Sequence, residues 1–183
     1  MLEKYFIEHC SPTLASIKCA NLFSCSYTSE QQFDEQLSQW NVHFMPKGIQ
    51  LFVLRKRNGT ALVYMYRPVQ LAKDLCKPET AAFLGQYGYT DMNIDAVINR
   101  LAARVQLTDS FPHEIGVMLG YPLADVIGFI IHKGENCKLS GTWKVYGDEH
   151  TAARTFARLK KCKAVYKNLY SKGKSVLRLT VAA

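Results

Sequence analysis

Two segments joined by Asn58-Gly59 constrain the fold of this chain more than any other feature of its sequence. Residues 49–57 and 60–66 each contain a continuous apolar run, and the Asn-Gly pair tolerates the positive φ angles of a two-residue type I′ turn. We therefore predict a β-hairpin over residues 49–66. Because both strands carry apolar side chains on both faces, we expect helices to cover much of the hairpin on each side.

Length and composition indicate one globular domain over residues 1–183. A chain of 183 residues is long enough to bury its own core without a metal or disulfides. Hydrophobic residues make up 48% of the chain and charged residues 21%, a balance that excludes a disordered protein. No internal repeat or linker divides the sequence, so we expect a single domain.

Serine and proline residues mark the starts of several expected helices. Ser11-Pro12 is typical of a helix start, and Ser29 with Gln32 fits a capping box ahead of an apolar stripe. After a helix at the N-terminus, the helices predicted in this way cover residues 13–19, 30–40, 69–76, 78–86, 94–105, 112–119 and 122–133.

The C-terminal third predicts a strand, a long helix and a second strand. The strands lie near residues 140–146 and 175–181, with Leu177, Leu179 and Val181 on one face, and the helix covers about 148–172. Short links between these elements favour a right-handed βαβ unit with parallel strands. The predicted class is an α+β domain whose mixed sheet contains the 49–66 hairpin and these two strands, packed with several helices.

No segment predicts export or a membrane span. The N-terminus lacks a secretory signal. The longest apolar stretches, near 117–119 and 126–131, are interrupted by glycine, proline or aspartate, far short of the roughly 20 apolar residues that a membrane helix needs. We therefore expect a cytoplasmic protein with no membrane partner.

Six cysteines occur at irregular spacing and form no CxxC pair. This spacing argues against a zinc knuckle or a redox motif, so we expect mostly buried, reduced thiols. Cys10, Cys19 and Cys25 are close enough in sequence to leave a metal site as an alternative. The sequence predicts no metal site and identifies no cofactor.

Positive charge is concentrated in the second part of the chain. Residues 1–110 hold 11 basic and 10 acidic side chains, whereas residues 111–183 hold 12 and 5, and the net charge of the chain is +8. The long C-terminal helix has one apolar face and one basic face, the latter including Arg154, Arg158, Lys161 and Lys163. An alternative function is therefore salt-sensitive binding of nucleic acid by this helix.

Residues 114–126 have the spacing of a DNA-binding helix-turn-helix. Their second helix offers Leu123, Ala124 and Asp125, which supply neither base-reading donors nor charge for phosphates. We therefore favour a buried helical hairpin here.

Aromatic residues beside cations suggest a ligand site. Such groups occur around Arg67, and around Lys144 and Tyr146, while His113 opens a predicted helix. They predict a non-catalytic protein that uses Arg67, His113, Lys144 and Tyr146 to hold a small anionic ligand or a protein partner. An enzyme using His113 and Glu114 is a weaker alternative, because no HExxH, GxSxG or P-loop pattern occurs.

Several longer strings resemble the signature of a bacterial protein family of unknown function. They are Phe111-Pro112-His113-Glu114-Ile115-Gly116, Leu119-Gly120-Tyr121-Pro122, Asp125-Val126, Gly128-Phe129, Lys133-Gly134 and Trp143-Lys144-Val145-Tyr146-Gly147-Asp148. The segments 9–15 and 66–68 resemble it too, so the resemblance covers nearly the whole chain. It implies no reaction, cofactor or catalytic residue.

Overall fold

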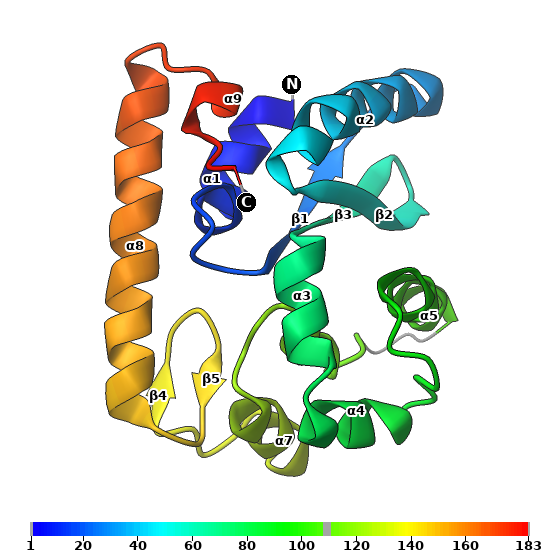
Figure 1. The fold of residues 1–183 in the computed structure, drawn as a ribbon, viewed down its shortest axis with the longest axis vertical. Coiled ribbons are helices and arrows are strands. Elements are labelled where there is room, and N and C mark those ends of the chain that lie inside the picture. The colour runs from blue at the N-terminus through cyan, green and yellow to red at the C-terminus, as the bar shows by residue number, and fades with distance from the viewer. Residues whose placement is uncertain (1, 108–110, 183) are drawn as a thin grey trace.

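A three-stranded antiparallel sheet lies at the centre of the computed structural model, which describes residues 2–107 and 111–182 (Figure 1). Its strand order is β1 (Ala20–Ser26), β3 (Thr60–Tyr66) and β2 (Gln50–Arg57). Asn58 and Gly59 have φ angles of 50° and 69°, as a type I′ turn requires. The predicted 49–66 hairpin is therefore confirmed, and β1 adds a strand that the sequence did not clearly mark.

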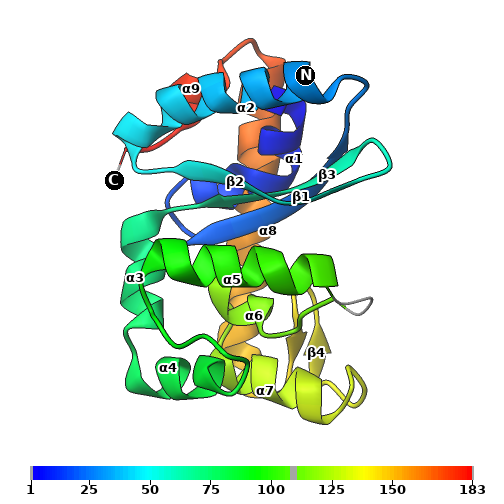
Figure 2. The ribbon, with the colours of Figure 1, turned by 90° about the vertical axis from the view of Figure 1, so that its right-hand side faces the viewer.

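Helices cover both faces of this sheet, as Figure 2 shows. On one face lie α1 (Leu2–Leu14), α2 (Glu30–Phe44), the short η1 (Met45–Lys47) and α9 (Val176–Leu179). On the other face lie α3 (Pro68–Leu75), α4 (Pro78–Gly85), α5 (Ile94–Leu107), α6 (Ile115–Met118) and α7 (Leu123–Ile131). The α+β class predicted from the sequence is confirmed.

Two hydrophobic cores result, one on each side of the sheet. Along β3, Leu62, Tyr64 and Tyr66 belong to the core with α3–α7, and Ala61, Val63 and Met65 belong to the core with α1, α2 and α9. The side chains of a strand point alternately to opposite faces, so one apolar strand supplies both cores.

The N-terminal helix differs from the prediction. A helix was expected over residues 13–19, but α1 runs through Pro12 and ends at Leu14. Pro12 lies in the last turn, and the Ser11 hydroxyl donates a hydrogen bond to the Ile7 carbonyl. Residues 15–19 instead form a turn leading into β1, with Ser16 at a φ of 58°.

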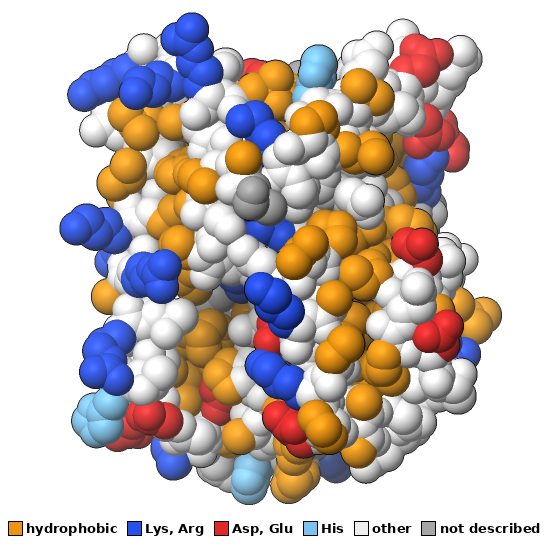
Figure 3. All heavy atoms as spheres, viewed as in Figure 1, with side chains coloured by type: hydrophobic (Ala, Val, Ile, Leu, Met, Phe, Trp, Pro, Cys, Tyr) orange, Lys and Arg blue, Asp and Glu red, His pale blue; other side chains and the backbone are white. Residues whose placement is uncertain are grey.

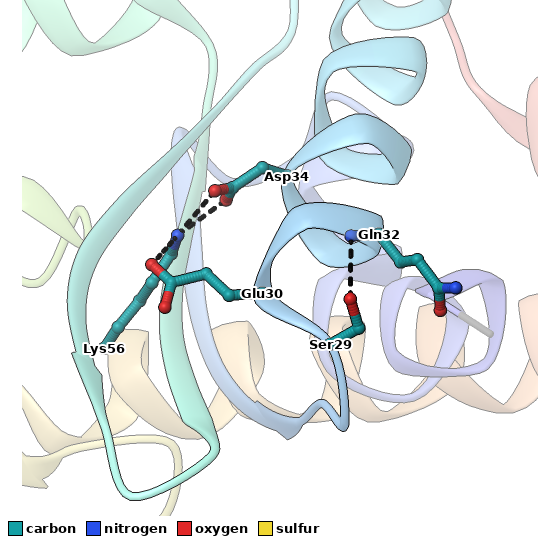
Figure 4. Close-up of polar contacts among 5 residues, drawn as sticks. All are labelled: Ser29, Glu30, Gln32, Asp34 and Lys56. Carbon is teal, nitrogen blue, oxygen red and sulfur yellow. Dashed lines mark hydrogen bonds and ion pairs between the residues drawn. The ribbon is translucent and has the colours of Figure 1, made fainter.

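Helix α2 begins where the capping signal placed it and is tied to β2 at the surface. The Ser29 hydroxyl accepts a hydrogen bond from the backbone N–H of Gln32. Lys56 of β2 reaches across to Glu30 and Asp34, at 2.9 and 2.7 Å (Figure 4). Exposed pairs of this kind contribute at most about 1 kcal/mol each to the free energy of unfolding. Their main effect is therefore to orient α2 relative to β2.

The predicted βαβ unit is wrong. Strands β4 (Leu139–Ser140) and β5 (Lys144–Val145) form a separate two-stranded antiparallel sheet, so the strands near 140–146 do not join the central sheet. Residues 175–181 are not a strand, because Val176–Leu179 is the short helix α9 with Ser175 as its N-cap. Val176 and Leu179 are both buried at a spacing of three, which suits a helical turn rather than a strand.

Helix α8 (Glu149–Ser171) runs along the side of the whole molecule (Figures 1 and 2). Asp148 caps it by accepting hydrogen bonds from the N–H groups of His150 and Thr151. Its first turns lie beside β4 and β5, and its later turns lie beside α1 and α9. In the described part of the chain no helix is both long and apolar enough to cross a membrane.

Candidate functional site

A pocket of about 210 Å³ lies among α6, α7 and the β5 region. We call it the α6–α7 pocket, and its wall is mostly apolar and rich in aromatic rings. The residues that line it are Phe111, His113, Ile115, Gly116, Leu119, Tyr121, Asp125, Val126, Phe129, Trp143 and Lys144.

The pocket brings together two of the four residues predicted to hold a ligand, His113 and Lys144. The imidazole of His113 packs edge-on against Phe129, with ring centroids 4.9 Å apart. The Nζ of Lys144 donates a hydrogen bond of 2.6 Å to the carbonyl of Gly134. An ammonium group has three N–H bonds, so two remain for a ligand.

Asp125 fixes one side of the pocket and uses its carboxylate for hydrogen bonds within the protein. Its carboxylate accepts hydrogen bonds from Trp143 Nε1 at 2.7 Å and from the N–H groups of Tyr146 and Gly147 at 2.8 and 2.7 Å. These bonds join α7 to the end of β5 and set the orientation of the Trp143 ring. Three donors on one buried carboxylate indicate a structural anchor rather than a general base.

Tyr146 and Arg67 lie outside the wall of the pocket. The Tyr146 ring stacks on His132 with centroids 5.4 Å apart, and its hydroxyl donates to the Glu135 carbonyl. The Arg67 side chain is 1% exposed. Burial lowers the pKa of its guanidinium, and its N–H groups are used within the protein.

The partners of Arg67 are four backbone carbonyls on the other side of the molecule. Nε donates to Thr13, Nη1 to Lys47, and Nη2 to both Leu14 and Val181, over 2.6–3.2 Å. Thr13 and Leu14 end α1, whose last carbonyls have no partner within the helix. Arg67 therefore joins the end of α1 to the C-terminal segment.

His113 and Glu114 do not face a common cleft. The Glu114 side chain is 1% exposed and forms an ion pair with Arg104 of α5. The Tyr89 hydroxyl also donates to it, at 3.3 Å, and burial together with Glu114 raises the pKa of that tyrosine. Glu114 thus anchors α5, whereas His113 lines the pocket, which removes the geometry that the enzyme alternative requires.

The predicted nucleic-acid residues all lie on the solvent side of α8. Arg154, Arg158, Lys161 and Lys163 are exposed, and Figure 3 shows the row of basic side chains along this edge. The ion pairs found between described residues all lie before residue 115. This basic surface is therefore not neutralised by acidic side chains of the described chain.

The cysteines do not gather into a metal site. No group of three or more His, Cys, Asp or Glu side chains among residues 2–107 and 111–182 is placed to hold a metal. Burial raises the pKa of Cys19 and Cys25 to about 11, so these thiols stay protonated at neutral pH. A protonated thiol is a poor metal ligand.

Two aromatic residues of the site, Trp143 and Tyr121, were not among the ligand-binding residues named from the sequence, although Trp143 belongs to the aromatic group around Lys144 and Tyr146. Trp143 stacks on Tyr121 with centroids 5.0 Å apart and meets Phe156 of α8 edge-on at 4.5 Å. Both residues belong to the strings that carry the family resemblance. Neither residue lies on a recognisable catalytic motif, so the strings that carry the resemblance were the signal that could have drawn attention to both.

The comparisons with known proteins agree with that resemblance. A family model described as a protein of unknown function, DUF3793, matches residues 6–180. No curated protein and no solved structure matches the chain.

Proposed function

The chain belongs to the DUF3793 family of proteins of unknown function, and we propose that it is a single-domain, cytoplasmic, non-catalytic protein that binds a small anionic ligand. The ligand is a flat, mostly apolar molecule with one anionic group, and it occupies the α6–α7 pocket. The observation that carries this proposal is that His113 and Lys144, which are 31 positions apart, line the same apolar hollow.

The size and chemistry of the pocket support this ligand class. An apolar cavity of about 150 Å³ is enough for benzene, so about 210 Å³ accommodates one aromatic ring with a small substituent. Phe129, Tyr121 and Trp143 offer ring faces and edges for stacking. Lys144 supplies the cation, since two of its N–H bonds are free to reach an anion.

Fluorescence of Trp143 tests the proposal, with benzoate as the probe. A Trp40→Phe background leaves Trp143 as the single tryptophan, because the chain contains two. We expect benzoate to change this fluorescence, and Lys144→Met to weaken binding about tenfold. Lys138→Met is a matched control, since Lys138 also donates to a backbone carbonyl, that of Gly147, but lies outside the pocket.

Two results would contradict the proposal. One is equal weakening by Lys144→Met and Lys138→Met, which indicates a general effect of charge. The other is binding of toluene as tight as that of benzoate, which means that no anionic group is recognised. Native mass spectrometry of protein purified from its own host then identifies the molecule carried in the cell.

A second candidate function is nucleic-acid binding by α8, and the distribution of charge favours it. Residues 149–183 hold 9 basic side chains and 1 acidic one, a net charge of +8, so the preceding 148 residues carry 14 of each and sum to zero. All nine of the basic side chains are exposed. The net charge of the chain thus comes from α8 and the residues that follow it, where exposed cations can contact a polyanion.

The salt dependence of binding tests this second function. We expect single- or double-stranded nucleic acid to bind at low salt, with an affinity that falls steeply as salt rises. The double variant Arg158→Glu/Lys161→Glu removes this binding, whereas Lys4→Glu/Arg57→Glu, an equal charge change at exposed sites elsewhere, preserves it. Absence of binding at low salt, or equal loss in both variants, would exclude a role for α8.

A further inference from the structure

A second hollow lies between α3 and α8 and is distinct from the α6–α7 pocket. Its volume is about 370 Å³, and it is lined by the turn at residues 16–19, by Gln70, Lys73 and Asp74 of α3, by Trp143, and by α8. We call it the α3–α8 cleft. Figure 3 shows a hollow between the α8 edge and the middle of the molecule, with hydrophobic side chains inside it and basic side chains on its rim.

Lys18 is the unusual residue of this cleft. It is 8% exposed, although lysine is among the residues least often buried. Its Nζ donates a hydrogen bond of 2.6 Å to the Ala20 carbonyl and lies 5.0 Å from the centroid of the Tyr121 ring. These contacts account for part of its hydrogen-bonding capacity but bring no negative charge to it.

No carboxylate compensates the Lys18 ammonium among the described residues. The acidic residue of the cleft is Asp74, and its carboxylate is paired at 2.6 Å with Lys77. Burial lowers the pKa of Lys18 to about 8, which is the response expected of an ammonium group that water and counter-charges do not stabilise. An anion next to this amine would stabilise its charged form.

The rest of the cleft supplies further donors for an anion. Lys73 is an exposed cation on the wall. Gln70 donates to the hydroxyl of Ser16 at 2.7 Å, so that hydroxyl keeps its own hydrogen to donate. The lining therefore combines one buried cation, one cation that reaches solvent and a neutral donor, a set that suits phosphate or carboxylate.

We propose that the α3–α8 cleft is a binding site for a small anion that carries a phosphate or carboxylate group, with Lys18 as its buried counter-ion and Lys73 as a second cation. This site is additional to the α6–α7 pocket, from which Trp143 separates it, since this residue lines both. The two proposals rest on different cations, Lys18 and Lys73 in the cleft and Lys144 in the pocket, so the failure of one proposal leaves the other standing.

Titration followed by lysine NMR tests this site in the intact protein. With ¹³Cε-labelled lysine, we expect the Lys18 signal to titrate with a pKa of about 8 in a buffer without phosphate or carboxylate, because burial lowers this pKa. Inorganic phosphate, glycerol phosphate and acetate are the three probes. We expect a saturable shift of the Lys18 signal with at least one of them and a rise of its pKa toward 10.5, its ordinary value. The probe that acts identifies the anionic group.

Variants separate the buried amine from general surface charge. Lys18→Met should weaken binding about tenfold and Lys73→Met about threefold. Lys160→Met, an equal loss of charge at an exposed position of α8 outside the cleft, should leave affinity within about twofold. The Trp143 fluorescence measures affinity in each variant, in a Lys144→Met background that removes the cation of the α6–α7 pocket, so that the response to phosphate or acetate reports the cleft.

Three outcomes would overturn the proposal. They are an unchanged Lys18 signal at about 20 mM of every probe, an affinity that Lys18→Met leaves unchanged, and weakening by Lys160→Met equal to that by Lys18→Met. If Lys18→Met does not fold, as circular dichroism would show, the titration of the Lys18 signal in the unaltered protein decides alone.

Discussion

Lys18, Arg67 and Glu114 are charged side chains that the fold buries almost completely, and each is stabilised in a different way. Arg67 distributes its charge over four carbonyl groups. Glu114 has Arg104 as a partner of opposite charge. Lys18 has one carbonyl and one aromatic ring. Because a buried charge needs both a counter-charge and hydrogen bonds to be stable, Lys18 is the least satisfied of the three.

Substitution of Arg67 should destabilise the fold without changing the α6–α7 pocket. We expect Arg67→Lys to lower the free energy of unfolding by about 3 kcal/mol, because a single ammonium cannot reach four carbonyls arranged around a planar guanidinium. Urea unfolding measures this loss, with Arg57→Lys, at an exposed position, as the control. Loss of benzoate binding in a folded Arg67→Lys protein would show instead that Arg67 serves the ligand.

Substitution of Lys18 should stabilise the protein at neutral pH. Burial lowers the pKa of Lys18 from 10.5 to about 8. Below pH 8 the buried charge therefore destabilises the unaltered protein by about 3 kcal/mol. Lys18→Met removes this cost but also loses the hydrogen bond to Ala20, which offsets part of the gain. We therefore expect Lys18→Met to raise the free energy of unfolding by about 2 kcal/mol at pH 7.

The pH dependence of this gain has a definite sign. Between pH 8 and 10.5 the unfolded chain keeps the Lys18 proton and the folded chain releases it, so the unaltered protein gains stability with pH relative to the variant. The advantage of Lys18→Met should therefore shrink from pH 7 to pH 9.5. Buried thiols such as Cys10 and Cys19 also make the free energy of unfolding depend on pH, and both proteins contain them. The quantity that tests the prediction is therefore the difference between the free energies of unfolding of the two proteins at each pH. An advantage that grows with pH would contradict the burial of a charged Lys18.

At the scale of the elements, the close approach of α7 to β5 depends on Gly128. A Cβ atom there would lie 2.5 Å from both Cβ and Cγ of Tyr146. Tyr146 cannot easily move, because its N–H is bound to Asp125. We expect Gly128→Ala to lower the free energy of unfolding by about 2–3 kcal/mol and to weaken binding in the α6–α7 pocket, which α7 and β5 enclose.

Gly85→Ala is the matched control for this substitution. A Cβ at Gly85, in α4, meets nothing within 4 Å, and alanine is the better helix former. Its urea midpoint should stay the same or rise slightly. Equal losses in the two variants would mean that the contact between α7 and Tyr146 is not tight.

Elements encoded by adjacent residues were predicted well, and elements that depend on distant contacts were not. The hairpin and the start of α2 follow from Asn58-Gly59 and Ser29, whose effects are local. The segment 176–179 alternates like a strand, but the Ser175 cap with buried Val176 and Leu179 favours a helical turn. Strands β4 and β5 are two residues long each, too short to dominate a sequence pattern.

The candidate site was predicted in part for the same reason. His113 and Lys144 belong to distinctive local strings and line the pocket. Arg67 lies in a similar aromatic setting, but its partners come from Thr13, Lys47 and Val181, positions that no local pattern connects. The burial of Lys18 was missed because lysine is normally exposed and only the folded arrangement of α3 and α8 encloses it.

At the scale of the whole molecule, the central strand β3 joins two cores that would otherwise be separate. All of its residues after Thr60 are buried, and it pairs with both β1 and β2. Helix α8 runs along both halves but has only Ala152 and Leu159 fully buried. The sheet, rather than α8, therefore couples the two sides of the molecule.

This arrangement predicts that the two halves unfold together, and native-state hydrogen exchange tests it. Loss of either helical layer exposes one face of β3, Tyr64 on one side or Met65 on the other, so neither layer opens without destabilising the sheet that the other needs. We expect the β3 amides to exchange slowest, with an opening free energy equal to that of global unfolding. As denaturant is added, the opening free energies of the core amides of α1 and α5 should converge on this global value. Amides of α8 exchange at a lower free energy, because few of its side chains are buried.

Exchange of α5 through a separate opening that leaves α1 and β3 protected would show that the layers are independent, and would contradict a single cooperative unit.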